Sequence, residues 1–343
     1  MHTEPHLTFR VEIVFNTFNV NSRRWQGNTL VLRLNADGAH GIIHDGAELC
    51  ERLLQAKVDA CISRVKDMTY LPNVVFDIGL HKGEDTEFYL KKGFDVVAFE
   101  ANPDLIEHCA RRFRQHTAQG RLHIVEGAIA PEAAGERLAF YKNVQKSVWG
   151  TIEPSWADRN QRLGTESIKI EVPRTDLASA FRVYGMPYYL KIDIEGADYV
   201  VLQDLQKCND RPCYVSIEAE KVDFAQLKDT LGMLGGLGYR AFKAVQQATI
   251  PNMEIVTTTV QGEPVRHVFV SGASGPFGED LPGSWSGHDA CLRQFETIFR
   301  LYRLFGDDGI VSRAPGGALL MRGLTRLYRK PLPGWYDIHA KLG

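Results

Sequence analysis

The sequence has few cysteines for its length and lacks any long apolar run. Only six of its 343 residues are cysteine, and no two of them form a CxxC pair. Scattered cysteines without an accompanying histidine pattern indicate reduced, packed thiols, so neither a disulfide framework nor a structural zinc site is expected. No apolar stretch reaches the roughly 18 to 20 residues that cross a bilayer, and the polar start of the chain lacks the apolar core of a signal peptide. We therefore expect a cytoplasmic protein that does not span a membrane.

An excess of basic residues is also missing. Forty Lys and Arg residues stand against 42 Asp and Glu residues, which gives a formal net charge of -2. Sequence-independent binding to nucleic acid needs clustered positive charge, so nucleic acid is not expected as a partner. The amino-acid composition is ordinary for a globular protein, with 44% hydrophobic and 24% charged residues. The chain is long enough to bury a sizeable core.

The pattern of the chain changes near residue 70. Two strand-like stretches and a helical pattern from Ala47 to Met68, with one apolar face, precede this point. We expect residues 1–70 to form a small α+β extension that serves packing, homodimer formation or covering of the site. Residues 71–272 are expected to form the main domain, and residues 273–343 a loop and helical segment that completes it.

Strands and helices alternate through the main domain. Apolar β-branched runs separated by amphipathic helices predict an α/β fold with a mostly parallel seven-stranded sheet and helices on both faces. Such a sheet binds ligands at the carboxyl ends of its strands. Residues 138–172 are too long and too aromatic for a simple connection, and we expect a β-excursion over that end. The expected strands are Val74–Ile78, Asp95–Glu100, Leu122–Glu126, Tyr188–Asp193, Tyr214–Glu218, Tyr239–Ala244 and His267–Val270.

The first strand-turn-helix unit has the pattern of a nucleotide-like cofactor site. The strand ends in Asp77, and Gly79 and Gly83 follow in the spacing DxGxxxG. Glycines let the backbone turn sharply close to a ligand, and the next helix offers free N–H donors at its amino end. Glu100 closes the following strand 21 residues after Gly79, a spacing at which an acid can accept hydrogen bonds from both ribose hydroxyls.

The details of this unit disfavour a dinucleotide. A nicotinamide-binding turn has the pattern GxGxxG, whereas this turn is Gly79-Leu80-His81-Lys82-Gly83. Asp77 would also repel a pyrophosphate. An acidic strand end fits a cofactor with a cationic group, such as the ammonium and sulfonium of S-adenosylmethionine.

A second charged constellation ends the strand in "YYLKIDIEGADYVVL". Lys191, Asp193 and Glu195 alternate just before a helix, so side chains at the end of this strand point into the same crevice. Charges at the end of a buried strand are costly unless they are paired or functional. An ion pair between Lys191 and one of the acids is an equally good interpretation. Glu218, at the end of the neighbouring strand, adds a carboxylate to this edge.

Together these motifs resemble the FkbM family of S-adenosylmethionine-dependent methyltransferases. The matching pieces are FDIGLHKGEDTEFYLKKGF, VVAFEANP, EGAIA, RTDLASAF and LKIDIEGADYVVLQDL, with GPFGEDLPGSW and WYDIHA also similar to bacterial members. The resemblance covers about Asn73 to His339 and leaves the first seventy residues outside it. It implies a Rossmann-like class I methyltransferase fold and methyl transfer to a hydroxyl of a sugar, polyketide or other secondary metabolite.

The resemblance also implies which residues hold the cofactor. We expect Asp77 and Gly79 near the methionine portion and Glu100 on the ribose. The remaining expected cofactor contacts are Gly83, Asp85 and Thr86 at the helix amino end, Ala101 and Asn102 beside the adenosine, and Gly127 and Ala128 near the adenine.

Methylation of an alcohol also requires that the hydroxyl lose its proton. We expect Asp193 and Glu195 to accept the proton and Lys191 to orient them, with His81 as a rival because it lies in the cofactor turn. We assign no metal ligands. An Mg²⁺ ion held by Asp193, Glu195 and Glu218 is an alternative that we do not favour.

Three other functions stay open from the sequence. An N-methyltransferase of a small molecule or peptide differs only in the acceptor pocket, which fold does not dictate. A nicotinamide-dependent oxidoreductase shares the general fold but is disfavoured by the glycine spacing. A non-catalytic module that binds the cofactor without turnover is the third.

Overall fold

Two parts of the chain form separate compact units, Met1–Asp67 and Met68–Gly343. The structure is a computed structural model that describes residues 18–19, 24–25, 30–33, 40–43, 70–194, 196–221, 223–306, 309–313, 323 and 334–343. In the first unit two antiparallel strand pairs are described: β1 (Phe18–Asn19) with β2 (Arg24–Trp25), and β3 (Leu30–Arg33) with β4 (His40–Ile43). The helix expected from Ala47 to Met68 lies outside the described residues.

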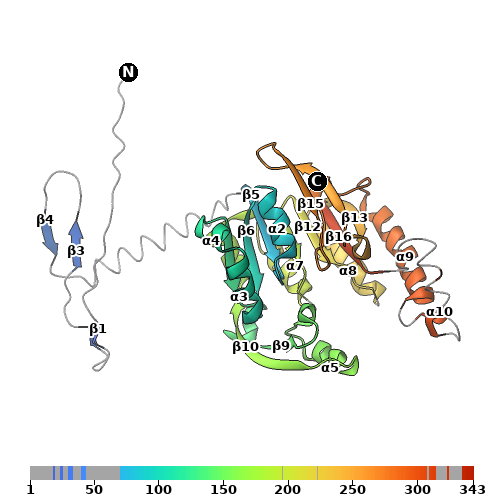
Figure 1. The fold of residues 1–343 in the computed structure, drawn as a ribbon, viewed down its shortest axis with the longest axis horizontal. Helices are drawn as coiled ribbons and strands as arrows, with labels where there is room; N and C mark the ends of the chain where they lie inside the picture. The colour runs from blue at the N-terminus through green and yellow to red at the C-terminus, as the bar shows by residue number, and fades with distance from the viewer. Residues whose placement is uncertain are drawn as a thin grey trace, which may run out of the picture. The chain divides into compact units, whose positions relative to one another are not determined.

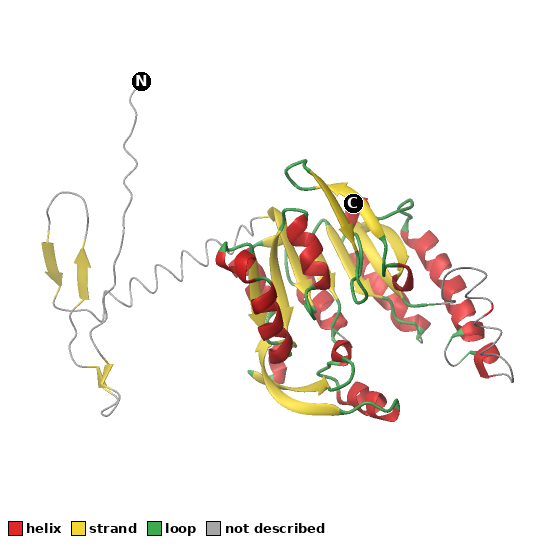
Figure 2. Ribbon diagram, viewed as in Figure 1, coloured by secondary structure: helices red, strands yellow, loops and turns green. Residues whose placement is uncertain are grey.

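A seven-stranded sheet forms the centre of the second unit (Figures 1 and 2). Its strand order is β13-β16-β12-β11-β5-β6-β7, and the five strands from β12 to β7 are parallel. β16 runs antiparallel to both of its neighbours. This mixed α/β architecture confirms the predicted fold class. The strands are β5 (Tyr70–Ile78), β6 (Asp95–Glu100), β7 (Leu122–Glu126), β11 (Met186–Ile192), β12 (Tyr214–Glu218), β13 (Tyr239–Gln246) and β16 (Tyr336–Leu342).

The seventh strand is not the one that the sequence indicates. The stretch His267–Val270 was expected in the main sheet, but β15 (Pro264–Val268) forms a separate antiparallel hairpin with β14 (Glu254–Thr258). The seventh position is taken by β16, between β12 and β13. Asp337 and His339 are buried in β16 beside Ile338 and Ala340, so half of its buried side chains are polar and the apolar strand signal is weak.

Helices cover both faces of the sheet. In β5, Phe76 and Ile78 face one core while Val75 faces the other, because successive side chains of a strand point to opposite faces. The first core is covered by α6 (Leu177–Tyr184), α7 (Asp198–Gln206), α8 (Phe224–Gly236) and α9 (His288–Phe305). The second is covered by α2 (Glu84–Lys91), α3 (Pro103–Arg112), Phe113 just before α4 (Arg114–Ala118) and the loop that follows β15.

Phe277 anchors that loop on the second face. Its ring stacks on Tyr189 at 4.1 Å with an interplanar angle of 3°, and Tyr89 and Phe94 approach it within 5.4 and 5.6 Å. We expect Phe277→Ala to lower the free energy of unfolding by about 3–5 kcal/mol, because it empties a close-packed aromatic site. Urea denaturation measures this loss. Val256→Ala, at a side chain that is 71% exposed, should change stability little; equal losses would contradict the role of Phe277.

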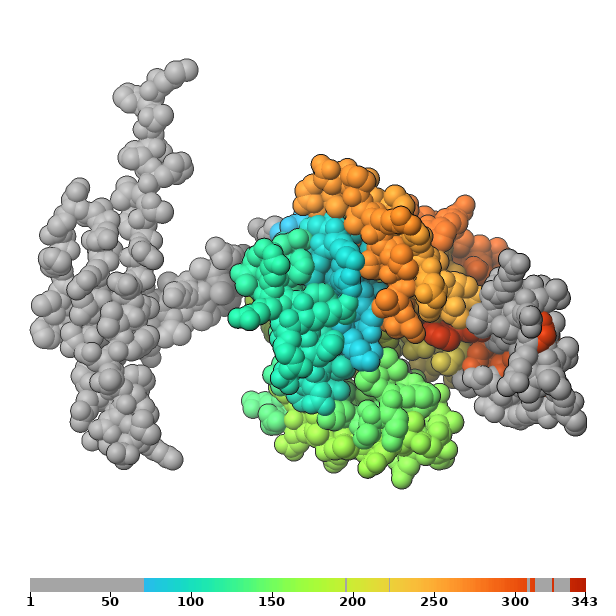
Figure 3. All heavy atoms as spheres, viewed as in Figure 1, coloured from blue at the N-terminus to red at the C-terminus, as the bar shows by residue number. Residues whose placement is uncertain are grey.

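A β-excursion leaves the sheet between β7 and α6. In it β10 (Ser167–Thr175) pairs with β8 (Ala128–Ile129) and, antiparallel, with β9 (Arg137–Asn143). Figure 3 shows this excursion in green at the lower edge of the second unit. It agrees with the expected insertion over residues 138–172. The remaining helices described are η1 (Glu132–Ala134), η2 (Ser147–Trp149), α5 (Pro154–Arg162), η3 (Gln247–Thr249), η4 (Gly278–Asp280) and α10 (Ile310–Arg313).

Candidate functional site

A cavity opens at the carboxyl ends of β5, β6 and β11. This is the place where open α/β sheets bind ligands. Most of its lining comes from the turn after β5, the strand ends of β6 and β11, and the β-excursion. The cavity therefore lies where the sequence predicts the cofactor.

The turn after β5 is held close to two neighbouring strands. The backbone N–H groups of Gly79 and Leu80 donate to the carbonyl oxygen of Phe99, at 3.1 and 3.0 Å. Gly79 has a φ of +95°, and a Cβ atom on it would lie 1.9 Å from the carbonyl oxygen of Asp193. Only glycine fits this approach of the turn to the end of β11.

A buried ammonium group lies beneath the turn. The Nζ atom of Lys191 is 3.1 Å from Asp85, 3.3 Å from Asp77 and 3.6 Å from Asp193, measured to the nearest carboxylate oxygens. It also donates to the carbonyl oxygen of Gly79 at 3.2 Å. Lys191 thus connects β5, α2 and the end of β11, which confirms the ion-pair interpretation of this residue. Of the three carboxylates, Asp77 and Asp85 are buried, whereas the Asp193 side chain is 43% exposed.

Burial and charge act against each other in this cluster. Burial raises the pKa of Asp77, and the Lys191 ammonium partly opposes this rise. Burial also raises the pKa of Asp85 to about 6. Burial would lower the pKa of Lys191, but the three carboxylates outweigh it and hold this pKa well above its ordinary value. Lys191 therefore keeps its charge, and the turn depends on that charge.

Glu100 presents its carboxylate where β6 ends. It accepts hydrogen bonds from the backbone N–H groups of His81 (2.9 Å), Ala101 (3.0 Å) and Asn102 (2.8 Å). Burial raises the pKa of Glu100, although these bonds oppose the rise. Two carboxylate oxygens offer about four acceptor sites, so three backbone bonds leave capacity for a ligand hydroxyl. Glu100 lines the cavity with this capacity.

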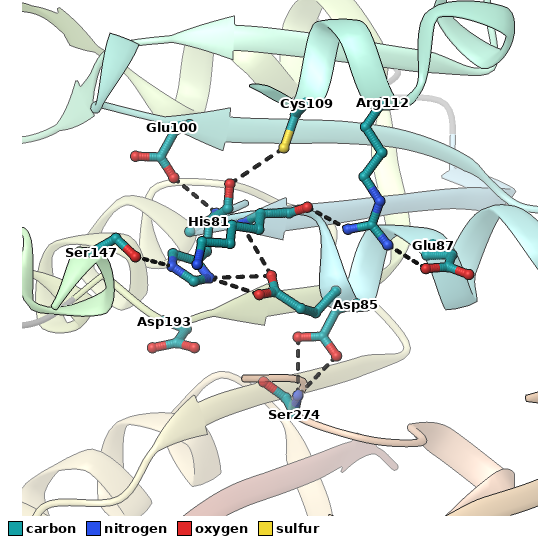
Figure 4. A network of polar contacts seen from close by, with 12 residues as sticks. His81, Asp85, Glu87, Glu100, Cys109, Arg112, Ser147, Asp193 and Ser274 are labelled. Carbon is teal, nitrogen blue, oxygen red and sulfur yellow. Dashed lines mark hydrogen bonds and ion pairs between the residues drawn. The ribbon is translucent and has the colours of Figure 1, made fainter. Parts of the chain in front are cut away.

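His81 ties the turn to the β-excursion, as Figure 4 shows. Its Nδ1 atom is 3.0 Å from a carboxylate oxygen of Glu84, and its Nε2 atom is 2.7 Å from the Ser147 hydroxyl. Burial alone would raise the pKa of Glu84, but the contact with His81 lowers it below its ordinary value. His81 has a φ of 51°, a rare conformation for a residue with a side chain, and such strain is typical of functional turns.

The predicted cofactor residues divide into two groups. Those that line the cavity are Gly79, Asp85, Glu100, Ala101, Gly127 and Ala128. Those that lie behind its wall are Asp77, Gly83, Thr86 and Asn102. Thr86 donates to Asp77 at 2.6 Å, and Asn102 caps α3 by accepting from the N–H of Asp104 at 3.1 Å. The second group supports the wall rather than forming its surface.

The predicted proton-handling residues also meet at the cavity. His81, from the turn after β5, lines it together with Lys191 and Asp193, which lie at the end of β11. Glu195 lies outside the described residues.

Among the described residues no group of three His, Cys, Asp or Glu side chains is placed to hold a metal ion. No described helix is long and apolar enough to span a membrane.

Several lining residues escaped the sequence interpretation. Glu84 has a local signal, because it opens α2 three residues after His81. The others come from distant segments, and nothing in the sequence indicates which side of a loop will face the cavity. They include Phe140, Ser147, Val148, Thr151 and Ile152 of the β-excursion and Gly272 of the loop after β15.

One family model matches part of the chain. Residues 77–241 match the sequence model of the methyltransferase FkbM domain. No curated protein matches the chain. Similar solved structures include a precorrin-6y C5,15-methyltransferase from Geobacter metallireducens, with 13% identity over 62% of this chain and 84% of that one, at a TM-score of 0.30.

Two other solved structures are similar at the same level. A SAM-dependent methyltransferase from Archaeoglobus fulgidus has 14% identity over 87% of this chain and all of its own (100%), at a TM-score of 0.28. The glycopeptide N-methyltransferase MtfA, complexed with S-adenosyl-L-homocysteine, has 9% identity over 84% of this chain and 89% of that one, at a TM-score of 0.26. Likeness this weak carries no argument about acceptors.

Proposed function

This chain is an S-adenosylmethionine-dependent methyltransferase with an FkbM domain on a Rossmann-like class I fold, and from that premise we propose that it methylates oxygen. The proposed acceptor is a hydroxyl of a sugar, polyketide or other secondary metabolite. The observation that carries the proposal is the half-exposed carboxylate of Asp193 in the cavity wall. An alcohol must lose a proton as its new C–O bond forms, and a carboxylate at this place can accept it.

The described residues fit the cofactor chemically. Glu100 has free acceptor capacity for a ribose hydroxyl, and Gly79 lets the chain approach a ligand closely. Gly127 and Ala128 line the side of the cavity proposed for the adenine. Acidic groups at the ends of β5 and β11 suit a cationic amino acid portion. When bound, S-adenosylmethionine supplies a methyl group on an activated sulfonium, so the protein mainly has to align and desolvate the acceptor.

The chain's own residues divide the remaining work. Asp193 takes the acceptor proton on its carboxylate, and Lys191, 3.6 Å away, is a positioning residue that holds this carboxylate at the cavity. The β-excursion contributes apolar walls through Phe140, Val148 and Ile152, which exclude water from the reacting groups. The hydrogen bond between His81 and Ser147 fastens this wall to the cofactor turn.

Asp193→Asn tests the proposed proton acceptor. With saturating S-adenosylmethionine, we expect the variant to transfer methyl groups to an alcohol about 10²–10⁴-fold more slowly than the original chain, because the amide cannot take the proton. The measurement is transfer of radiolabelled methyl to a panel of sugars, polyketide alcohols and phenols. Asp289→Asn, at an 85% exposed side chain on α9, is the control and should keep the original rate.

The same panel separates the alternatives. If only amines are methylated, at a rate that Asp193→Asn leaves unchanged, the acceptor atom is nitrogen and not oxygen. A neutral amine attacks without first losing a proton, so it does not need the carboxylate. Binding of S-adenosylhomocysteine without transfer to any acceptor would favour the non-catalytic module.

A further inference from the structure

The cavity is lined by an excess of negative charge. Among the described lining residues are four acids, Glu84, Asp85, Glu100 and Asp193, and one ammonium group, Lys191. Asp77 adds a fifth carboxylate directly behind the wall. One ammonium group and five carboxylates therefore lie in the cavity wall or directly behind it. This excess indicates that a ligand brings positive charge into the cavity.

Four of the five acids are already compensated by the protein. Glu84 pairs with His81, and Glu100 accepts three backbone hydrogen bonds. Asp85 pairs with Lys191 at 3.1 Å and accepts from the backbone N–H of Ser274 at 2.8 Å. Asp77 is held by Thr86 and Lys191.

Asp193 is the exception. Within the described residues its side chain makes one ion pair, the longest of the Lys191 contacts at 3.6 Å, and that ammonium is shared with two other acids. Its carboxylate is also the most exposed of the three Lys191 partners and lines the cavity. It is therefore the carboxylate that is most available to a cation in the cavity.

Cofactor and product differ in charge at one atom. S-adenosylmethionine carries a positive methylsulfonium, whereas S-adenosylhomocysteine carries a neutral thioether; the methyl group has moved to the acceptor and the acceptor proton has left. Both keep the same ammonium and carboxylate. A carboxylate that is only weakly paired and lies in the cavity wall attracts a ligand with one more positive charge more strongly.

We propose that Asp193 makes this site selective for the charged cofactor over its neutral product. Transfer then removes the charge that holds the ligand, so product leaves more readily than cofactor. The proposal rests on methyl transfer by this site but not on the identity of the acceptor. It assigns Asp193 a role in cofactor specificity in addition to the proposed acceptance of a proton.

Isothermal titration calorimetry on the full chain near neutral pH, without an acceptor, tests the proposal. The probes are S-adenosylmethionine, S-adenosylhomocysteine and sinefungin, in which a protonated amine replaces the methylsulfonium. We expect both cationic ligands to bind about tenfold or more tightly than S-adenosylhomocysteine. Sinefungin separates charge from the presence of the methyl group. In Asp193→Asn the preference should fall to about threefold or less, while Asp289→Asn keeps it.

Two results would overturn the proposal. One is equal or tighter binding of S-adenosylhomocysteine by the original chain. The other is an equal loss of affinity for all three ligands in Asp193→Asn. That result would mean that Asp193 binds the amino acid ammonium group that all three ligands carry. Thermal unfolding of each variant shows that it is folded. The titrations contain no acceptor, so the measured affinities do not depend on whether the acceptor is a hydroxyl. A result that overturns the cofactor preference would therefore not contradict O-methylation.

Discussion

Replacement of Lys191 by methionine is expected to lower the free energy of unfolding by about 3–5 kcal/mol. The methionine fills a similar volume but leaves Asp77 and Asp85 buried without their ammonium partner. Removing one member of a buried ion pair costs this much because the remaining charge is neither solvated nor compensated. Guanidinium denaturation followed by circular dichroism measures the loss.

A matched lysine and a change of pH check the cause. Lys91→Met removes a lysine from a half-exposed pair with Glu87 on α2 and should cost less than about 1 kcal/mol. The loss in Lys191→Met should shrink as the pH falls from neutral toward 5. The carboxyl groups that burial holds at raised pKa values take up protons in the folded state before they do so in the unfolded state. A loss that stays constant with pH would mean that packing, not charge, explains the effect.

Gly79→Ala is expected to abolish cofactor binding and to destabilise the chain by more than about 3 kcal/mol. The added Cβ would lie 1.9 Å from the carbonyl oxygen of Asp193, a backbone atom that cannot move without separating the turn from the end of β11. Both sides of this contact line the cavity. Binding of S-adenosylhomocysteine, followed by calorimetry, and urea denaturation give the two readouts.

Gly120→Ala is the control for backbone strain. Gly120 also has a positive φ, +71°, but a Cβ on it would have no atom within 4 Å. It should cost about 1–2 kcal/mol for the left-handed conformation and leave cofactor binding unchanged. The difference between the two variants isolates the close contact. Similar effects in both would show that conformation, rather than the approach of Asp193, makes glycine necessary at residue 79.

Buried strands with short, clear boundaries were predictable from the sequence. The expected strands Asp95–Glu100, Leu122–Glu126 and Tyr214–Glu218 coincide with β6, β7 and β12. Each is an apolar run with turn residues near its ends, so a local pattern is sufficient to define it. The same holds for the turn after β5, where glycine spacing and an acidic strand end indicated a cofactor with a cationic portion.

Contacts between distant segments were not predictable. The hydrogen bond between His81 and Ser147 joins residues 66 positions apart, and the stack of Phe277 on Tyr189 joins residues farther apart still. Neither pair leaves a periodic signal, because each depends on how loops fold over the sheet. The sequence therefore indicates the strand ends that carry the candidate site but not the loops that form its walls.

The position of β16 has a consequence for how the chain is made. β16 lies between β12 and β13, yet it begins about 90 residues after β13 ends. At ordinary rates of translation the ribosome needs about 5 to 18 s to synthesise this interval. During that time β12 and β13 have each emerged without the neighbour that will lie between them, and unpaired strand edges can pair with other chains. The part of the sheet farthest from the cofactor turn therefore has unpaired strand edges until β16 has been made.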